Sequence, residues 1–249
     1  MVDKVLLVTG GSRGIGRSIA LLAARHGWAV GVNYTAGAEA AGAVVSRVRE
    51  NGGRAIAIQG DVSREDDVIR LFDETTAQLG VPTGLANNAG INLPRANIVD
   101  MTAERMMRIF SVNTFGAYLC AREAARRMSK SRGGQGGSIV NISSVAARMG
   151  SPNEYVDYAG SKAAVDAMTI GLSKELGPEG IRVNAVRPGL TDTDIHEAAG
   201  DPGRIARTAS AIPLGRAGSP DEVAQAAVWL LGDDASYVTG ALLDAGGGR

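Results

Sequence analysis

A tyrosine and a lysine four positions apart, Tyr158 and Lys162, have the clearest capacity for chemistry in this sequence. If their segment is a helix, the i, i+4 spacing places the phenol and the ammonium on one face. A cation beside a phenol favours the phenolate and lowers a pKa that is ordinarily about 10. Such a tyrosine can exchange a proton with an alcohol or carbonyl oxygen near neutral pH. The pattern alone is weak, because solvated helix faces carry the same pair.

A glycine-rich segment, residues 9–16 with the sequence TGGSRGIG, follows a short apolar run and opens a stretch of helical spacing. Gly10, Gly14 and Gly16 allow a tight turn, a close approach to a pyrophosphate and close packing of helix on strand. The free N–H groups and the dipole at a helix start favour phosphate. The segment therefore predicts a dinucleotide-binding loop, the alternative being a glycine-rich turn without a ligand.

The end of the second apolar run bears on which nucleotide binds. A cofactor with a free ribose 2′-OH is usually met there by a carboxylate. This chain has Asn33 and Tyr34 instead, with no acid before Glu39. Arg13 in the glycine loop can face a 2′-phosphate as a planar, permanently charged donor, unless it is an ordinary surface arginine. These residues predict NADP(H) rather than NAD(H).

The elements that must position these residues follow from the apolar pattern, which predicts an α/β sheet. Short, continuous apolar runs predict strands at residues 5–8, 29–32, 55–58, 84–86, 138–142, 181–186 and 241–244. Helical spacing predicts helices at residues 15–26, 39–50, 66–79, 104–128, 155–176 and 221–231. Continuous apolar strands joined by helices are typical of a doubly wound parallel sheet with helices on both faces. The ligand of such a sheet lies at the carboxyl ends of the strands.

Composition indicates a soluble protein with one domain over residues 1–249. The 26 basic and 26 acidic residues balance to a net charge of zero, which gives no support to a nucleic acid or a membrane as partner. Cys120 is the single cysteine, so no internal disulfide is possible and a reducing compartment is expected. The apolar stretch after Met1 is too short for a signal peptide or a membrane span. These features predict a cytoplasmic protein.

Further motifs stand at successive predicted strand ends, and one, Ser111-Val112-Asn113, lies within the long predicted helix. They are Asp61-Val62, Asn87-Asn88-Ala89-Gly90, Ser111-Val112-Asn113, Asn141-Ile142-Ser143-Ser144 and Pro188-Gly189. With the glycine loop and the tyrosine–lysine pair, they resemble the pattern of the short-chain dehydrogenase/reductase family over nearly the whole chain. Within that family the chain is most similar to the branch of bacterial 3-oxoacyl-carrier-protein reductases and sugar or polyol dehydrogenases. The resemblance implies a Rossmann-type fold and an enzyme that interconverts a carbonyl and a secondary alcohol by hydride transfer.

The resemblance also assigns roles to residues of this sequence. The catalytic group would be Asn113, Ser144, Tyr158 and Lys162: the lysine holds the nicotinamide ribose, the serine the substrate oxygen, and the asparagine a proton-relay water. The expected cofactor contacts are Gly10, Ser12, Arg13, Gly14, Ile15, Gly16, Asn33, Tyr34, Asp61, Val62, Asn87, Ala89, Gly90, Tyr158, Lys162, Pro188, Gly189, Thr191 and Thr193. No metal site is expected, because two histidines and one cysteine lack ligand spacing.

The serine spacing departs from the family pattern. The family usually places its serine thirteen positions before the tyrosine, whereas Ser144 stands fourteen before Tyr158 and Ser143 fifteen. We interpret the loop before Tyr158 as one residue longer, which keeps Ser144 as the catalytic serine and leaves Ser143 as the alternative.

A second departure concerns the substrate. Carrier-protein reductases resemble one another in having basic residues near the end of the helix after the tyrosine, where this chain has Glu179. A carrier-protein substrate is therefore not favoured, although a basic edge could still form from Arg126, Arg127, Lys130 and Arg132.

Residues 190–212 correspond to the mobile substrate lid of the family. Their mixture of acids, arginines and alanines hints at a polar substrate of modest size, and His196 could contact it. A module that senses NADP(H) without turnover is the alternative function, disfavoured because Tyr158 and Lys162 are both present. By resemblance, the helices at 104–128 and 155–176 form the contacts of a homotetramer or homodimer.

Overall fold

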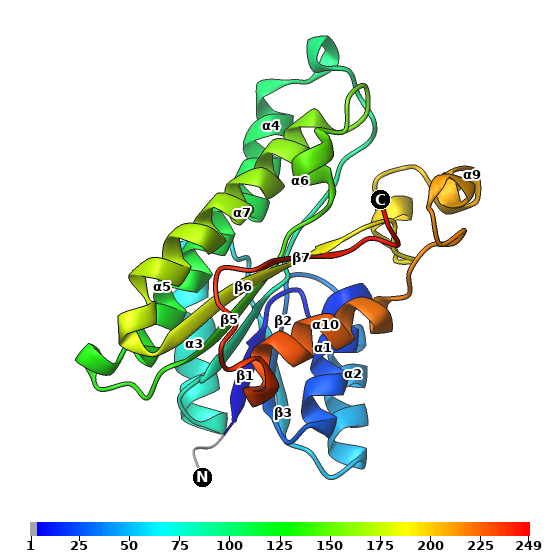
Figure 1. The fold of residues 1–249 in the computed structure, drawn as a ribbon. Helices are drawn as coiled ribbons and strands as arrows, with labels where there is room; N and C mark the ends of the chain where they lie inside the picture. Colours follow the sequence, from blue (N-terminus) through cyan, green and yellow to red (C-terminus); the bar gives the residue numbers. More distant parts are fainter. Residues whose placement is uncertain (1–3) are drawn as a thin grey trace.

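Seven parallel strands form one sheet, in the order β3-β2-β1-β4-β5-β6-β7 (Figure 1). The computed structural model describes residues 4–249, apart from the side chains of His196 and Ala198. The strands are β1 Val5–Val8, β2 Ala29–Tyr34, β3 Ala55–Gln59, β4 Gly84–Asn87, β5 Gly137–Ile142, β6 Ile181–Pro188 and β7 Leu242–Ala245. The strand order reverses between β1 and β4, and ligands of doubly wound sheets bind at such a switch point.

Helices cover both faces of the sheet. One face carries α1 Gly14–Arg25, α2 Ala38–Glu50 and α10 Pro220–Leu231, and the other carries α3 Glu65–Leu79, α5 Gly116–Met128 and α7 Val156–Glu175 (Figure 1). Strand β1 shows why both faces are covered. Leu6 and Val8 pack with the first group of helices, while Val5 and Leu7 pack with the second. All four side chains are fully buried, as the continuous apolar run predicts.

The helix predicted over 104–128 is interrupted. It consists of α4 Ala103–Phe110, a π turn at Ser111–Phe115 and then α5. At the start of α5, a Cβ on Gly116 would lie 2.8 Å from Val62 Cγ2, so only glycine permits this close contact. π turns within helices are frequently found at functional sites, and this one carries Asn113.

The remaining elements are short. They are α6 Ala146–Met149, α8 Ile195–Ala198, α9 Arg204–Thr208 and 3-10 turns at Ile98–Asp100, Lys130–Arg132, Gly177–Glu179, Ala209–Ala211 and Asp233–Ala235. Cys120 is fully buried, and burial raises the pKa of its thiol to about 12. No helix within residues 4–249 is long and apolar enough to cross a membrane.

Candidate active site

The carboxyl ends of β1 and β4 are joined by side-chain hydrogen bonds. Thr9 Oγ1 accepts hydrogen bonds from the backbone N–H groups of Asn88 and Ala89, both at 2.9 Å. Asn88 Nδ2 donates in return to the carbonyl oxygens of Thr9 at 2.9 Å and Gly10 at 3.1 Å. The glycine loop and the 87–90 turn are therefore one unit at the switch point of the sheet.

Two glycines of the loop have a backbone conformation that favours glycine, and a third is sterically required. Gly10 and Gly14 have φ values of 61° and 51°. A Cβ on Gly16 would lie 2.3 Å from the Gly10 carbonyl oxygen and 2.5 Å from Asn88 Nδ2. The start of α1 therefore lies directly against the loop, as a dinucleotide-binding turn requires.

A hollow of about 390 Å³ lies in front of the start of α1. It is lined by Ser12, Arg13 and Arg17 from the loop and helix, and by Asp192, Thr193 and Asp194 from the opposite side. The first turn of α1 contains no acidic residue, so its N–H groups and positive dipole end can accept an anion. The sequence prediction named Arg13 and missed Arg17, although the four-residue spacing on a helix was a readable signal.

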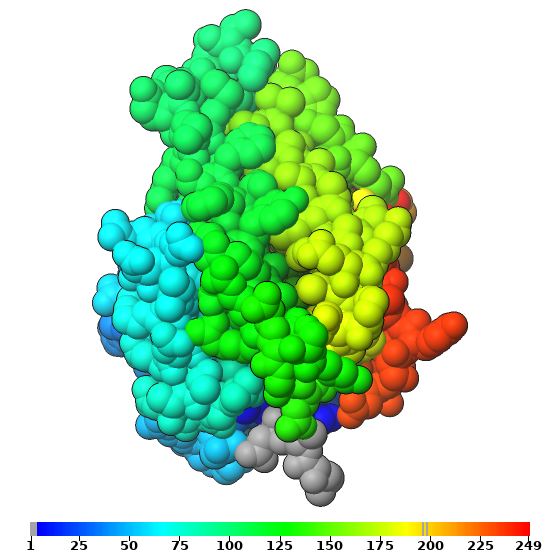
Figure 2. All heavy atoms as spheres, turned by 90° about the vertical axis from the view of Figure 1, so that its left-hand side faces the viewer, coloured from blue at the N-terminus to red at the C-terminus, as the bar shows by residue number. Residues whose placement is uncertain are grey.

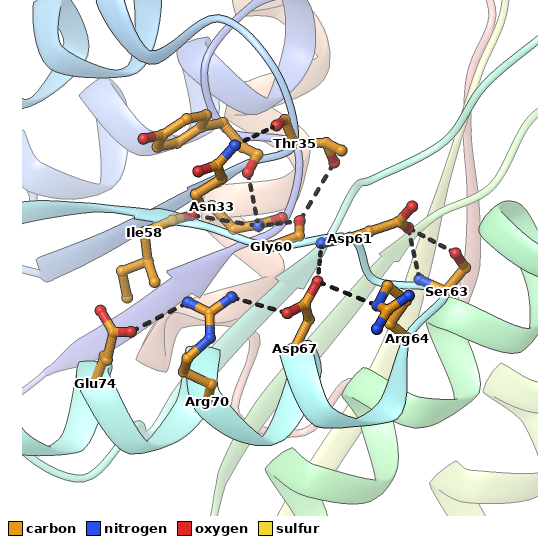
Figure 3. A network of polar contacts seen from close by, with 12 residues as sticks. Asn33, Thr35, Ile58, Gly60, Asp61, Ser63, Arg64, Asp67, Arg70 and Glu74 are labelled. Carbon is orange, nitrogen blue, oxygen red and sulfur yellow. Dashed lines mark hydrogen bonds and ion pairs between the residues drawn. The ribbon is translucent and has the colours of Figure 1, made fainter.

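Asn33 supports the glycine loop, and Figure 3 shows its contacts with the end of β3. Its Oδ1 accepts a hydrogen bond from the Gly10 N–H at 3.1 Å, and its Nδ2 donates to the Gly60 carbonyl oxygen at 2.9 Å. The side chain is 1% exposed. The structure thus uses the Asn33 side chain to tie β2 to both neighbouring strand ends, and places Tyr34 at the partly exposed end of β2.

Asp61, at the end of β3, is held by a second set of contacts (Figure 3). Its Oδ1 accepts hydrogen bonds from the Ser63 N–H at 2.9 Å and the Ser63 hydroxyl at 2.7 Å, and Oδ2 lies 3.6 Å from Arg108 Nη1. Burial alone would raise the pKa of Asp61, but the Ser63 hydrogen bonds and the Arg108 charge together hold it below its usual value. Val62 is buried against α5.

Lys162 points from α7 toward the ends of β4 and β5. Its Nζ donates a hydrogen bond to the Ile142 carbonyl oxygen at 2.8 Å and lies 5.9 Å from the centre of the Tyr158 ring. Burial lowers the pKa of Lys162 to about 8, against the opposing charge of Asp166. A Cβ on Gly90 would lie 3.3 Å from Lys162 Nζ and 3.4 Å from Asn113 Oδ1. The bare glycine therefore lies between the lysine and the asparagine.

Asn113 is fixed on both sides of its amide. Its Oδ1 accepts from the Ile91 N–H at 2.8 Å, and its Nδ2 donates to the Ile91 carbonyl at 3.0 Å and to Ser161 Oγ at 3.1 Å. Ser161 lies on α7 beside Lys162, so the π turn and α7 are joined at this point.

The two serines after β5 have different contacts. Ser143 is 2% exposed and donates through Oγ to the Lys162 carbonyl at 3.2 Å, so it joins β5 to α7. The Ser144 Oγ accepts from the Ala146 N–H at 3.1 Å, and interaction with the Ser144 side chain lowers the pKa of the Tyr158 phenol. Ser144 is therefore the serine beside the tyrosine hydroxyl.

The pKa of Tyr158 differs from the sequence prediction. Burial raises it, whereas the hydrogen bond from Ser144 and the positive charge of Arg204 lower it less strongly. The prediction of a lowered pKa was wrong for the protein as described, because burial outweighs the charges and cannot be seen in a four-residue spacing. The phenol is consequently a protonated group at neutral pH.

The loop before Tyr158 has unusual backbone geometry. Ser151 and Asn153 have φ values of 45° and 62°, and Gly150 before them has 73°. Such values are uncommon outside glycine and mark local strain, which often occurs near functional sites. This is the segment in which the sequence indicates one extra residue.

The remaining predicted contacts lie along the same edge. Asn87 Nδ2 donates to the Ala117 carbonyl at 2.9 Å and to Asn141 Oδ1 at 3.1 Å, which commits it to the interior. Ile15 packs against the core. The Pro188 carbonyl accepts from the Val145 N–H at 3.0 Å, and a Cβ on Gly189 would lie 2.7 Å from Gly246 Cα.

The predicted lid consists of short helices rather than a plain loop. Thr191 is buried, and Thr193 Cγ2 would lie 3.3 Å from a Cβ on Gly14, so the lid begins against the glycine loop. The prediction for His196 falls on a side chain outside the described residues. Arg204, on α9, was not predicted, and no sequence pattern marked it. Among the described residues, no group of His, Cys, Asp and Glu has metal-site geometry.

Comparison with known proteins finds relatives over nearly the whole chain. A family model described as "Enoyl-(Acyl carrier protein) reductase" matches residues 10–249. The uncharacterized oxidoreductase YgfF of Escherichia coli (strain K12) is 50% identical over 245 residues, which covers 98% of this chain and 99% of the relative. A 3-oxoacyl-[acyl-carrier-protein] reductase of Synechocystis sp. is 38% identical over 249 residues, covering 100% and 97%.

Solved structures share the same fold. A short-chain type dehydrogenase/reductase from Mycobacterium marinum superimposes with a TM-score of 0.92 at 35% identity, covering 98% of this chain and 94% of the other. A dehydrogenase/reductase from Sinorhizobium meliloti 1021 gives 0.91 at 36% identity, covering 100% and 95%. The matched family model and relatives over almost the full length show that this chain is an oxidoreductase of the short-chain dehydrogenase/reductase family.

Proposed function

We propose that the protein interconverts a carbonyl and a secondary alcohol with NADP(H), using Ser144, Tyr158, Lys162 and Asn113. One observation carries the proposal: Lys162 Nζ and Asn113 Oδ1 both lie within 3.4 Å of the Cβ position of Gly90, and the same Nζ lies 5.9 Å from the centre of the Tyr158 ring, whose pKa the Ser144 side chain affects. Four polar side chains thus meet at the carboxyl edge of the sheet, where its ligands bind.

The residues present fit a dinucleotide. The tight packing of Gly16 on Gly10 brings the start of α1 against the loop, and the hollow in front of it is lined by the guanidinium groups of Arg13 and Arg17 beside the N–H groups of the first helical turn. A pair of arginines suits the doubly charged 2′-phosphate of NADP(H), although Asp192 and Asp194 border the hollow on its other side. The bound nicotinamide would supply or accept the hydride.

Tyr158 is the proton donor in carbonyl reduction. Its raised pKa keeps the phenol protonated at neutral pH, and Ser144 is placed to bind the same substrate oxygen. Lys162, with a pKa of about 8, can hold a ribose hydroxyl and still exchange a proton near neutral pH. Asn113 fixes the turn beside it and positions the path by which protons return from solvent.

The proposal extends to the substrate class, the compartment, the partners and the oligomeric state. The substrate is a small molecule, the compartment is the cytoplasm, and neither a nucleic acid nor a membrane is a partner. A homotetramer, or a homodimer, is proposed because α4, α5, α7 and the π turn expose apolar side chains, among them Phe110, Phe115, Tyr118 and Ile170. Figure 2 shows α5 and α7 side by side on one broad face of the molecule.

A 3-oxoacyl-carrier-protein reductase is the second candidate, supported by the description of the matched family model and by the Synechocystis relative. Glu179 weighs against it. Its carboxylate accepts a hydrogen bond from the Ser131 N–H at 2.9 Å, and that bond lowers the pKa of Glu179. The carboxylate is therefore held negative at the edge where an acidic carrier protein would need positive charge.

The test is the oxidation of NADPH, and separately of NADH, with a panel of ketones, ketoacyl esters and sugars. Turnover with a lower KM for NADPH is expected, and Tyr158→Phe should lower kcat by about 10²- to 10⁴-fold with nucleotide binding retained. Nucleotide binding without turnover on any substrate would indicate a sensing module instead. A lower KM for NADH would reject the cofactor assignment alone.

A further inference from the structure

Five charged side chains gather where the lid meets the loops around the site. Arg204 and Arg207 from α9 and Arg95 from the 91–97 loop lie near the carboxylates of Glu154 and Asp201. Arg204 Nη2 is 2.9 Å from Glu154 Oε2, and Arg207 Nη2 is 2.6 Å from Asp201 Oδ2. Counting these five charges gives three positive and two negative, so the cluster carries a net charge of +1.

Arg204 is the member of this cluster that is enclosed and incompletely bonded. Its side chain is 15% exposed, against 49% for Arg207 and 47% for Arg95. Its Nη1 is buried without a hydrogen-bond partner and lies 4.0 Å from Asp201 Oδ2, beyond hydrogen-bond distance. An unmet buried donor costs free energy, and an acceptor placed beneath the lid would recover it.

Arg204 also contacts the residue that caps the start of α7, the helix that carries the reacting tyrosine. Its guanidinium carbon lies 4.8 Å from the centre of the ring of Tyr155, which is buried three positions before the catalytic tyrosine. Its positive charge also lowers the pKa of the Tyr158 phenol, although burial raises that pKa more strongly. Besides Lys162, which lies against the Tyr158 ring, a substrate at Tyr158 would therefore have a second cation on the lid side, and its Nη1 has no acceptor.

We propose that Arg204 binds a carboxylate of the substrate and makes the protein selective for oxo acids and hydroxy acids over neutral carbonyl compounds. A carboxylate offers the acceptor that Nη1 lacks and brings the charge of the cluster to zero, whereas a phosphate would leave it negative. The inference rests on the proposed reaction and adds its substrate class.

The first experiment compares oxo acids with the carboxylate one to three carbons from the ketone, each beside its methyl ester. For the best chain length, kcat/KM with NADPH should favour the acid by at least about tenfold, as a charged hydrogen bond predicts. Esters that equal or exceed their acids throughout the set would overturn the proposal.

Substitutions then separate substrate binding from a purely structural role of the Arg204–Glu154 pair. Arg204→Gln should reduce kcat/KM for the acid about 10- to 100-fold more than for the ester, and Arg204→Lys should restore part of the preference. Glu154→Gln breaks the same ion pair but keeps the guanidinium, so the preference for the acid should persist or grow. If Glu154→Gln and Arg204→Gln both lower acid and ester by the same factor, the pair only holds the lid.

Arg216→Gln is the matched control, since Arg216 pairs with Glu222 at 2.8 and 2.6 Å outside the cluster. It should leave the preference intact. If an Arg204 variant does not fold, the unmodified protein still decides the question by inhibition: propanoate should inhibit competitively at least about tenfold more strongly than propanamide. Equal inhibition would count against the proposal.

The two proposals fail in different ways. Reduction of neutral ketones at least as fast as of oxo acids would overturn the substrate class and leave the oxidoreductase assignment standing. No reduction of any carbonyl compound would overturn both.

Discussion

Lys162 Nζ donates a 2.8 Å hydrogen bond to the carbonyl oxygen of Ile142, the last residue of β5. The ammonium is thereby anchored to the strand end that carries Ser144, with only 4% of the residue exposed. The hydrogen bond orients the charge, and burial penalises it, which is why the pKa of Lys162 falls from 10.5 to about 8. The hydrogen bond therefore fixes where the ammonium lies, and its burial lowers its pKa.

Replacing this lysine should change how stability depends on pH. Between pH about 8 and 10.5 the unfolded chain binds the Lys162 proton and the folded protein does not, so the free energy of unfolding rises with pH in that window. The gain is at most about 3 kcal/mol. Lys162→Met has no such proton to lose and therefore lacks this gain. The difference in free energy of unfolding between the unmodified protein and the variant should grow as the pH rises from about 8 to 10.5. Urea unfolding at several pH values measures this, and a constant difference would refute it.

The two serines should separate by function. Ser144→Ala removes the hydroxyl beside the Tyr158 phenol and should lower kcat about 10- to 10³-fold with little change in stability. Ser143→Ala removes the hydrogen bond to the Lys162 carbonyl and should cost about 1 kcal/mol of stability while turnover persists. Steady-state kinetics and thermal unfolding check both variants. The reverse pattern would transfer the catalytic role to Ser143.

Gly16 should not tolerate even a methyl group. Its Cβ would meet the Gly10 carbonyl oxygen at 2.3 Å, so Gly16→Ala forces the backbone apart, costs about 1–3 kcal/mol and weakens nucleotide binding. Gly42→Ala, in α2, is the control: its Cβ meets nothing within 4 Å, and the substitution should stabilise by about 0.5–1 kcal/mol. Unfolding curves and NADPH titration compare the two. Tight binding by Gly16→Ala would contradict the contact.

Removing Arg13 or Arg17 should weaken the use of NADPH but not that of NADH. Arg13→Gln and Arg17→Gln each remove a guanidinium from the hollow before α1 and should raise KM for NADPH about tenfold or more. KM for NADH should change less than about twofold, because the missing partner is the 2′-phosphate. Parallel kinetics with both nucleotides give the answer, and equal effects on the two would place the arginines at the shared pyrophosphate.

Much of the fold was predictable because apolar runs and glycines report local structure. The strand at Val5–Val8 was predicted with its observed bounds, and the seven-stranded parallel sheet was confirmed. The π turn at Ser111–Phe115 was missed, since its residues suit an ordinary helix and the extra residue per turn arises from packing around Asn113. The family pattern named Asn113 without showing how the helix presents it.

The site was less predictable where burial and distant charges decide its chemistry. Burial sets the direction of the Tyr158 pKa, and it acts against Ser144 and against Arg204, which is 46 positions away in the chain. No sequence motif marks Arg204, because what distinguishes it is a buried N–H without a partner on α9, which only the folded structure shows. Spacing along a chain identifies groups that share an element, but it does not reveal how solvent is excluded from them.

The brace formed by Asn33 has a consequence for any attempt to redesign nucleotide preference. Introducing an acid at the end of β2 is the obvious route toward NAD(H), yet at position 33 it would exchange the amide that donates to the Gly60 carbonyl for an anion in a buried site. The same change would set a carboxylate oxygen against that carbonyl, so the contact between β2 and the end of β3 would be lost even though an oxygen would remain to accept from the Gly10 N–H. Asn33 is therefore needed to support the loop and should be kept. An acid meant to favour NAD(H) should instead replace the neighbouring Tyr34 or Thr35.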